Sequence, residues 1–309
     1  MKLIKFTLAA AILACGVSYA AETAYTTPVG YYTFDGSAGG NVFVPSFVEP
    51  AAFSGEITAA TATTMTVSGS LTANAFDAGA SYATYYVEIT SGDNEGVVID
   101  IASNTDSEIT LDSDVSALSL TGSETIAIRP HVTLGSALEG GASVLAAYAD
   151  SASFYNTDGS ISTYVWDGAG NWTSNFIDAD GNDRPIPPAT GFVLNVTSDV
   201  DLVVSGEVKS GATVVQLTAG VVNIVGPTNP LVGDSTPIAD LGFSNMAAYA
   251  DSLTIYDPGT LGNPVSYLAD GAGNVTVDFI SASTDEMNHT TGGVLTASGD
   301  TSLRIDTGL

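Results

Sequence analysis

The chain has 309 residues, of which 34 are Asp or Glu and only six are Lys or Arg, so its formal net charge is -28 at pH 7. Nucleic acids and anionic membranes are held by Lys and Arg, and neither is an expected partner of such a chain. Because like charges repel, we expect a saline or calcium-containing medium outside the cytoplasm.

The first 20 residues have the pattern of a secretory signal peptide. Two lysines precede an apolar run from Phe6 to Val17, which leads to the small-x-small cleavage site Ser18-Tyr19-Ala20. Cleavage after Ala20 would bring the net charge to -30 and remove Cys15, the one cysteine. Disulfides, thiolate nucleophiles and cysteine metal sites would then be excluded. We expect an exported protein, extracellular or on the cell surface, with the periplasm as a further possibility.

A lipoprotein signal is the alternative interpretation of the same segment. Ile12-Leu13-Ala14-Cys15 loosely fits the pattern at which a lipid is attached, and the protein would then be anchored through Cys15. No later stretch approaches the ~20 continuous apolar residues of a transmembrane helix, so we expect no transmembrane insertion.

The composition favours an all-β fold. Val, Ile, Thr and Tyr are frequent, the chain holds 33 glycines, and helical periodicity is nearly absent. Strands joined by tight turns have this composition.

Three motifs occur twice in the same order, which indicates a duplicated supersecondary unit. The first pair has an offset of 101 residues and the second an offset of 103. The pairs are Ala146–Ser151 with Ala247–Ser252, Asp167–Asn171 with Asp270–Asn274, and Phe176-Ile177 with Phe279-Ile280. We therefore expect two copies of one small β-sandwich.

The spacing upstream of the repeat predicts an insertion in the first copy. Aligning Gly30 with Gly206 gives an offset of 176, about 75 residues more than the repeat itself. The expected layout is a signal peptide (1-20), a first module (21-52 plus 131-205), an inserted β-barrel-like domain (53-130) and a second module (206-309). Closing the inserted strands into a barrel would satisfy their edges.

Three further motifs carry a resemblance to a known group of proteins. They are Thr27-Pro28-Val29-Gly30-Tyr31, Ile128-Arg129-Pro130-His131, and Tyr164–Trp172 followed by Pro187–Phe192. Together they resemble an uncharacterised family of secreted proteins, mainly from verrucomicrobial genomes, with repeated aromatic and glycine-rich β modules. The resemblance implies an exported compartment and this architecture, and it implies no reaction.

One acidic loop is a candidate calcium site. Asp178, Asp180, Asn182 and Asp183 place carboxylate or amide oxygens at alternating positions, a spacing that can wrap a hard cation such as Ca²⁺. The glycine and glutamate positions of a helix-loop-helix calcium site are not matched. A polar turn whose side chains bond their own backbone is the alternative.

Three aromatic residues of the first copy are candidate ligand-binding residues. Tyr164, Trp166 and Trp172 could form a platform on which sugar rings stack, and Tyr164 and Trp166 share one face of a strand. The alternative is that this face is the core of a small sandwich. In the second copy Ala269 and Val275 stand where the tryptophans would be, so such a platform would belong to the first copy alone.

Little in the sequence supports catalysis. The two histidines, His131 and His289, fall at non-equivalent points of the copies, and no nucleophile elbow or zinc motif accompanies either. We therefore expect a non-catalytic exported protein acting in surface assembly, adhesion or scaffolding, with self-association or an extracellular polysaccharide as partner and no cofactor other than Ca²⁺. The alternatives are a carbohydrate-binding protein using Tyr164, Trp166 and Trp172, and a secreted hydrolase, which would need two carboxylates in a pocket.

Overall fold

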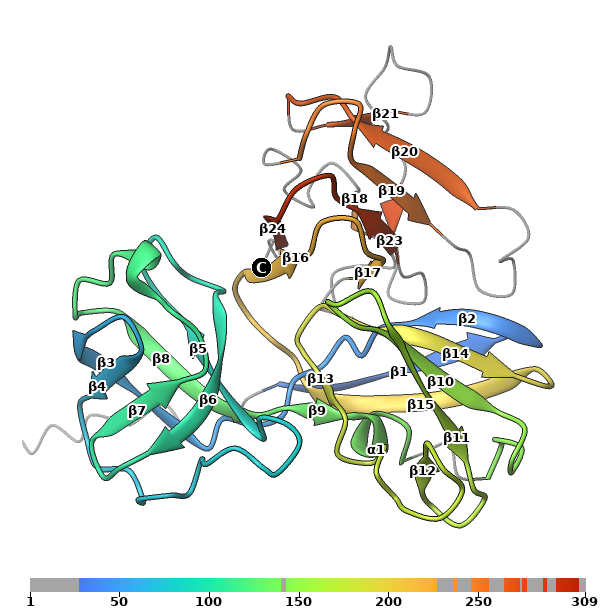
Figure 1. The fold of residues 1–309 in the computed structure, drawn as a ribbon, viewed down its shortest axis with the longest axis horizontal. Coiled ribbons are helices and arrows are strands. Elements are labelled where there is room, and N and C mark those ends of the chain that lie inside the picture. Colours follow the sequence, from blue (N-terminus) through green and yellow to red (C-terminus); the bar gives the residue numbers. More distant parts are fainter. Residues whose placement is uncertain are drawn as a thin grey trace, which may run out of the picture.

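The computed structural model describes residues 28–139, 143–226, 236–237, 246–255, 264–272, 274–276, 286–287 and 293–305. The predicted signal peptide, Cys15, His289 and the Phe279-Ile280 pair lie outside the described residues. The expected all-β class is confirmed: two similar sandwiches and a closed barrel form the chain (Figure 1). Among the helices described, none is long and apolar enough to cross a membrane.

The first sandwich, called module 1, packs a two-stranded sheet on a five-stranded sheet. The sheet orders are β1-β15 and β12-β11-β10-β14-β2, with a small β13-β9 pair beside them. The elements are β1 (Val29–Gly36), β2 (Gly39–Phe43), β9 (Val132–Thr133), α1 (Leu134–Ala137), β10 (Ser151–Tyr155), β11 (Ile161–Trp166), β12 (Trp172–Thr173), β13 (Pro185–Ile186), β14 (Phe192–Val196) and β15 (Val200–Glu207).

Alternation along the strands builds the core of module 1. In β1, Tyr32 and Phe34 point inward while Tyr31 and Thr33 are exposed. Phe34 meets Phe43 of the five-stranded sheet edge to face, with ring centroids 4.9 Å apart. Because successive side chains of a strand face opposite ways, each sheet contributes one apolar face to a shared interior.

The second sandwich, called module 2, repeats this arrangement strand for strand. Its sheet orders are β16-β24, β17-β23-β19-β20-β21 and β18-β22. The elements are β16 (Thr213–Leu217), β17 (Asn223–Val225), β18 (Thr236–Pro237), β19 (Ser252–Ile255), β20 (Val265–Ala269), β21 (Val275–Thr276), β22 (Glu286–Met287), β23 (Gly293–Thr296) and β24 (Thr301–Ile305).

The predicted alignment of Gly30 with Gly206 is wrong. Gly206 lies in β15, the last strand of module 1, where it pairs directly with Gly30 of β1. The true counterpart of β1 is β16: Asn41 accepts a hydrogen bond from the Ser37 amide, and Asn223 accepts the equivalent bond from the Thr218 amide. The two glycines are strand partners within module 1 and not equivalent positions of the two copies.

The inserted domain is a closed six-stranded barrel with the order β3-β4-β7-β6-β5-β8. Its interior is filled by aliphatic side chains such as Ile57, Val87 and Ile101. The elements are β3 (Phe53–Ala60), β4 (Thr64–Val67), β5 (Tyr85–Ile89), β6 (Val98–Asn104), β7 (Glu108–Leu111), the 3-10 helix η1 (Ser116–Leu118) and β8 (Thr125–Pro130).

The chain enters and leaves the barrel on neighbouring strands. Phe53 in β3 pairs with Ile128 in β8, so the barrel stands between β2 and β9 with its two ends side by side. In module 2, β17 ends at Val225 and β18 begins at Thr236, so the sequence leaves no room for a barrel at the equivalent point. The far boundary of module 1 extends beyond the predicted residue 205, because β15 pairs with β1 up to Glu207.

The three domains contact one another (Figure 1). Module 1 meets module 2 through a bridge between Thr190 and Val225, and the barrel meets module 2 through a bridge between Val97 and Val214. The second contact requires a glycine, because a Cβ on Gly96, at φ +91°, would lie 2.6 Å from the Ala212 carbonyl oxygen.

Candidate functional site

The aromatic residues predicted to bind a ligand lie in the core of module 1. Tyr164, Trp166 and Trp172 are all buried, and Trp172 is only 1% exposed. The two tryptophans face each other across β11 and β12, with ring centroids 5.4 Å apart. The expectation of a sugar-binding platform at these rings is corrected by this burial, since a ring needs an open face to stack on a sugar.

Tyr164 nevertheless reaches the domain boundary. Its hydroxyl lies 2.9 Å from the hydroxyl of Tyr82, which belongs to the barrel. Burial and the neighbouring Tyr82 raise the pKa of Tyr164 to about 12, so the hydroxyl stays protonated. Tyr164 therefore joins module 1 to the barrel.

The four residues of the predicted calcium site lie close together in the sequence, but their side chains share no hydrogen-bond partner. Asp180 accepts from the amide and hydroxyl of Ser174, and Asp178 accepts from the side chain of Asn175. Asn182 accepts from the Trp172 amide, while Asp183 is exposed at the rim of a pocket. Within the described ranges no group of three or more His, Cys, Asp or Glu is arranged to hold a metal ion.

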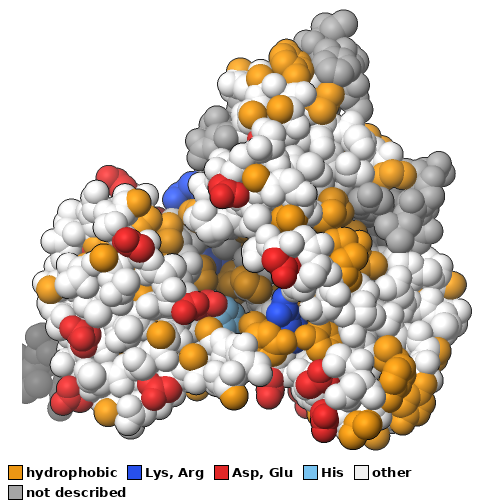
Figure 2. Space-filling model, viewed as in Figure 1, with side chains coloured by type: hydrophobic (Ala, Val, Ile, Leu, Met, Phe, Trp, Pro, Cys, Tyr) orange, Lys and Arg blue, Asp and Glu red, His pale blue; other side chains and the backbone are white. Residues whose placement is uncertain are grey.

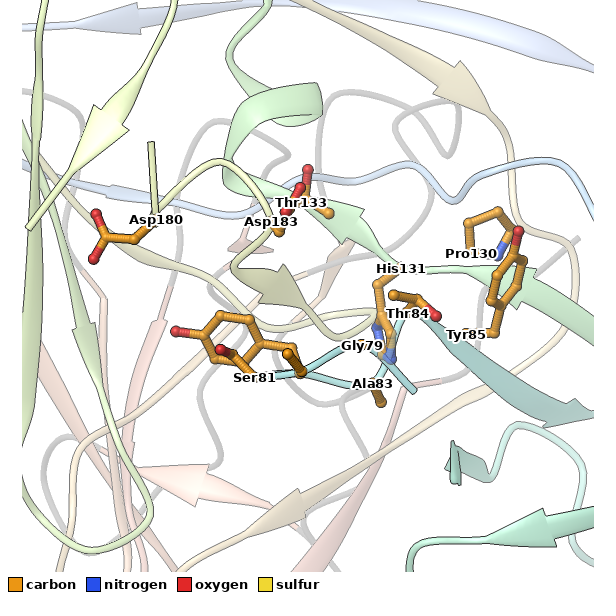
Figure 3. A pocket seen from close by; sticks show the side chains of 12 residues that line it. Gly79, Ser81, Ala83, Thr84, Tyr85, Pro130, His131, Thr133, Asp180 and Asp183 are labelled. Carbon is orange, nitrogen blue, oxygen red and sulfur yellow. The ribbon is translucent and has the colours of Figure 1, made fainter. Parts of the chain in front are cut away.

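A pocket of about 520 Å³ opens between the barrel and module 1. Figure 2 shows the hollow between these two domains, and Figure 3 shows its lining. One side is the barrel segment 79–85, and the other is formed by Pro130, His131, Thr133, Asp180 and Asp183. In Figure 3 the Asp180 carboxylate is directed away from the other labelled side chains.

His131 is the buried titratable group of this pocket. Its Nε2 lies 2.9 Å from Oδ1 of Asp100, and its ring packs 4.9 Å from the ring of Tyr86. Its Nδ1 is buried and has no hydrogen-bond partner. A His-Asp pair catalyses acyl transfer only when the second ring nitrogen reaches a nucleophile, and here it contacts none.

The carboxylates of the pocket do not form an acid and base pair of the glycosidase type. Partial burial works to raise the pKa of Asp180, but the hydrogen bonds from Ser174 outweigh it and hold that pKa below its usual value. A general acid would need the opposite shift. Asp180 therefore lacks the raised pKa of a general acid.

A buried ion-pair cluster lies where the three domains meet. Glu88 of β5 pairs with Arg129 of β8 at 2.9 Å and with Lys209, which leads into module 2, at 2.7 Å. Arg129 also pairs with Glu207 of β15 at 2.6 Å, and Lys209 donates to the Ala212 carbonyl. These four side chains, Glu88, Arg129, Glu207 and Lys209, are called the junction cluster.

The two other cations that the structure describes also join domains. Arg184 of module 1 lies over the ring of Tyr82 in the barrel, 5.2 Å from its centroid. Arg304 of β24 donates to the carbonyl of Glu95 in the barrel at 2.8 Å. Sequence reasoning counted these cations only as part of the net charge. No local pattern reveals their positions, because each contact joins residues far apart in the chain.

The chain has no significant match among protein-family models, curated proteins or solved structures. The resemblance to the secreted verrucomicrobial-type family stays a prediction. Function therefore has to be argued from the geometry of this chain.

Proposed function

We propose that the chain is a non-catalytic, exported protein that acts at the cell envelope or outside the cell in assembly, adhesion or scaffolding. The observation that carries the proposal is the position of its cations. All four that the structure describes, Arg129, Arg184, Lys209 and Arg304, contact a neighbouring domain or the junction between domains.

Such an arrangement fixes orientation more than it adds stability. Buried ion pairs gain little net free energy, because desolvation offsets their attraction, but a mispaired state would leave a charge buried without a partner. A scaffold or adhesin needs its domains held in one relation. An acidic chain that uses its few cations at the domain boundaries meets that need.

The pocket at the barrel boundary supports the same proposal. His131 has no nucleophile at Nδ1, and the pKa of Asp180 is lowered. The exported compartment rests on the pattern of the first 20 residues.

The proposal is tested on the chain processed after Ala20, with the Arg304→Met variant as its matched comparison. Light scattering after size exclusion, with calcium and then with chelator, gives the mass, and small-angle scattering gives the shape. We expect one fixed arrangement of three domains, loosened in Arg304→Met. The wild-type chain should release no product from polysaccharide or ester substrates. Domains that move independently in the wild type, or substrate turnover, would contradict the proposal.

A further inference from the structure

Two loops at one end of module 1 expose aromatic side chains next to each other. Tyr148, just before β10, is 62% exposed, and Phe176, just after β12, is 61% exposed. Their ring centroids are 6.3 Å apart. Ile177 beside them is more exposed still. Tyr148, Phe176 and Ile177 are called the aromatic patch.

Module 2 presents the same tyrosine in the same way. Tyr249 is 56% exposed, and its φ of 58° matches the φ of 57° at Tyr148. The Tyr148 amide donates to the Trp166 carbonyl, and the Tyr249 amide donates to the Ala269 carbonyl. The turns beneath match too: a Cβ on Gly168 would meet Ala147, and one on Gly271 would meet Ala248.

The exposed tyrosine recurs in both copies, although the two tryptophans of the core do not. Tyr148 recurs as Tyr249, and the sequence repeats Phe-Ile at 279–280. Trp166 and Trp172, fully packed in module 1, are replaced by the buried Ala269 and Val275 in module 2. Other core positions do recur, such as the buried Tyr164 and its counterpart Tyr267, so the exposed tyrosine is kept as strictly as part of the core.

Backbone preference does not explain the tyrosines either. A bulky residue at positive φ is strained, and Gly or Asn would avoid that strain. A strained, exposed aromatic residue that recurs in both copies indicates selection for what its ring contacts.

We propose that the aromatic patch, together with Tyr249 of module 2, binds an uncharged polysaccharide by stacking on the faces of its sugar rings. The inference rests on the adhesive form of the proposed function and names its partner. Aromatic rings give sugars a flat apolar face, and polar groups beside them fix the hydroxyls. Here Asn175 and the exposed carboxylate of Asp178 flank Phe176 in the same loop.

The size of the patch argues against a second protein. An aromatic side chain buries roughly 150 to 250 Å² when fully covered, so three partly exposed side chains supply about 500 Å² at most. A stable protein interface needs about 800 Å² from each partner. A second copy of this chain would also bring another net charge of -28.

Charge also selects among polymers. The cations that the structure describes are engaged at domain junctions, so none is placed at the patch to hold a carboxylated or sulfated chain. An uncharged polymer is not repelled. Its repeating unit suits a repeated site, because a second weak contact on the same polymer raises the overall affinity.

The test is affinity electrophoresis of the processed chain in gels containing one soluble polymer each. Hydroxyethylcellulose, xyloglucan, galactomannan and soluble starch are the uncharged probes, and alginate is the anionic one. We expect at least one uncharged glycan to retard the wild-type chain. Tyr148→Ala/Phe176→Ala should weaken that binding at least tenfold, and Tyr249→Ala should weaken it less. Tyr31→Ala, which removes an exposed tyrosine from β1, is the matched control and should bind like the wild type.

Several outcomes would overturn the inference. They are retardation by none of the uncharged glycans, retardation by alginate alone, binding unchanged in Tyr148→Ala/Phe176→Ala, and a dimer that those substitutions abolish. Glycan binding that is unchanged by the patch substitutions would leave the proposed adhesive function intact but would rule out this site. Release of reducing ends from a bound glycan would instead contradict the proposed non-catalytic function.

Discussion

Modules 1 and 2 share one strand order and some core residues, such as Tyr164 and Tyr267, but differ at other core positions. Where module 1 has Trp166 and Trp172, module 2 has Ala269 and Val275, and all four are buried. The hydrogen bonds that a buried aspartate accepts near the strand ends are the same in both modules. Asp150 accepts from the amide and hydroxyl of Thr197, and Asp251 accepts from those of Ser298.

Turn contacts and the hydrogen bonds accepted by these two aspartates therefore specify this sandwich more strictly than the identity of its core residues does. A buried acceptor must find its donors, whereas apolar volume can be supplied in several ways. Variants of the core, of the buried charges and of the turns test whether these hydrogen bonds matter more than the identity of the core residues.

Truncating a core residue should give the largest difference in stability loss between the two modules. Trp172→Ala removes a fully buried indole and should lower the free energy of unfolding of module 1 by about 3 to 5 kcal/mol. Val275→Ala, at the equivalent site, removes two methyl groups and should cost about 1 to 2 kcal/mol. Calorimetric unfolding of both variants measures the difference. Equal losses would mean that the two cores are packed to the same degree around this position.

The junction cluster should be next in effect. Lys209→Met leaves the buried Glu88 with Arg129 as its remaining ionic partner, and we expect a loss of about 3 kcal/mol. The double variant Glu88→Gln/Lys209→Met, which also removes the buried charge, should recover part of that loss. Chemical denaturation gives both values. A double variant worse than the single one would show that the carboxylate itself is needed.

The hydrogen bonds accepted by Asp251 should make the stability of module 2 sensitive to acid. Burial works to raise the pKa of Asp251, but hydrogen bonds from Ser298 and Ala247 outweigh it and lower that pKa below its usual 3.8. A lowered pKa contributes stability above about pH 4 that is lost as the pH falls through the folded value. Asp251→Asn should lose about 1 to 3 kcal/mol at pH 7, and the loss should shrink as the pH falls below about 4.

Melting temperatures at pH 7 and pH 3 check this sign. The control is Asp93→Asn, at an exposed turn of the barrel. A loss in Asp251→Asn that is as large at pH 3 as at pH 7 would show that the side chain acts by shape rather than by charge.

The smallest effect should be found at the strained tyrosine. Tyr148→Gly should leave stability unchanged or raise it by about 1 kcal/mol, because glycine accepts a φ of 57° without strain. Ile161→Gly, at an exposed position of β11, should instead lower stability by about 0.5 to 1 kcal/mol. Thermal melting compares the two. A clear loss in Tyr148→Gly would indicate that the exposed ring supports the fold.

The sequence allowed the all-β class to be predicted because its signals, strand alternation and tight turns, are local. The Asp167–Asn171 turn, for example, bonds within five residues, and its repeat at Asp270–Asn274 does the same. The alignment of Gly30 with Gly206 failed because it rested on one glycine in a short motif, and that glycine belongs to the last strand of module 1.

The candidate site could not be predicted in the same way. Even spacing places Tyr164 and Trp166 on one face of a strand, but it does not say whether that face is covered. In the structure that face is buried in the core of module 1, and Tyr148 and Phe176 in nearby turns are exposed instead. A tyrosine repeated at the same place in a turn of both copies was the signal that could have found them.

Because the two ends of the barrel lie side by side, the barrel could be removed from the chain or exchanged for another domain. Since Phe53 and Ile128 are paired neighbours, a cut at both strands leaves two ends that a short turn can rejoin. Module 2, which passes from β17 to β18 without such a domain, serves as a natural template for that shortened chain. The barrel is thus a cassette, and a different domain with adjacent termini could be carried at the same place on this sandwich.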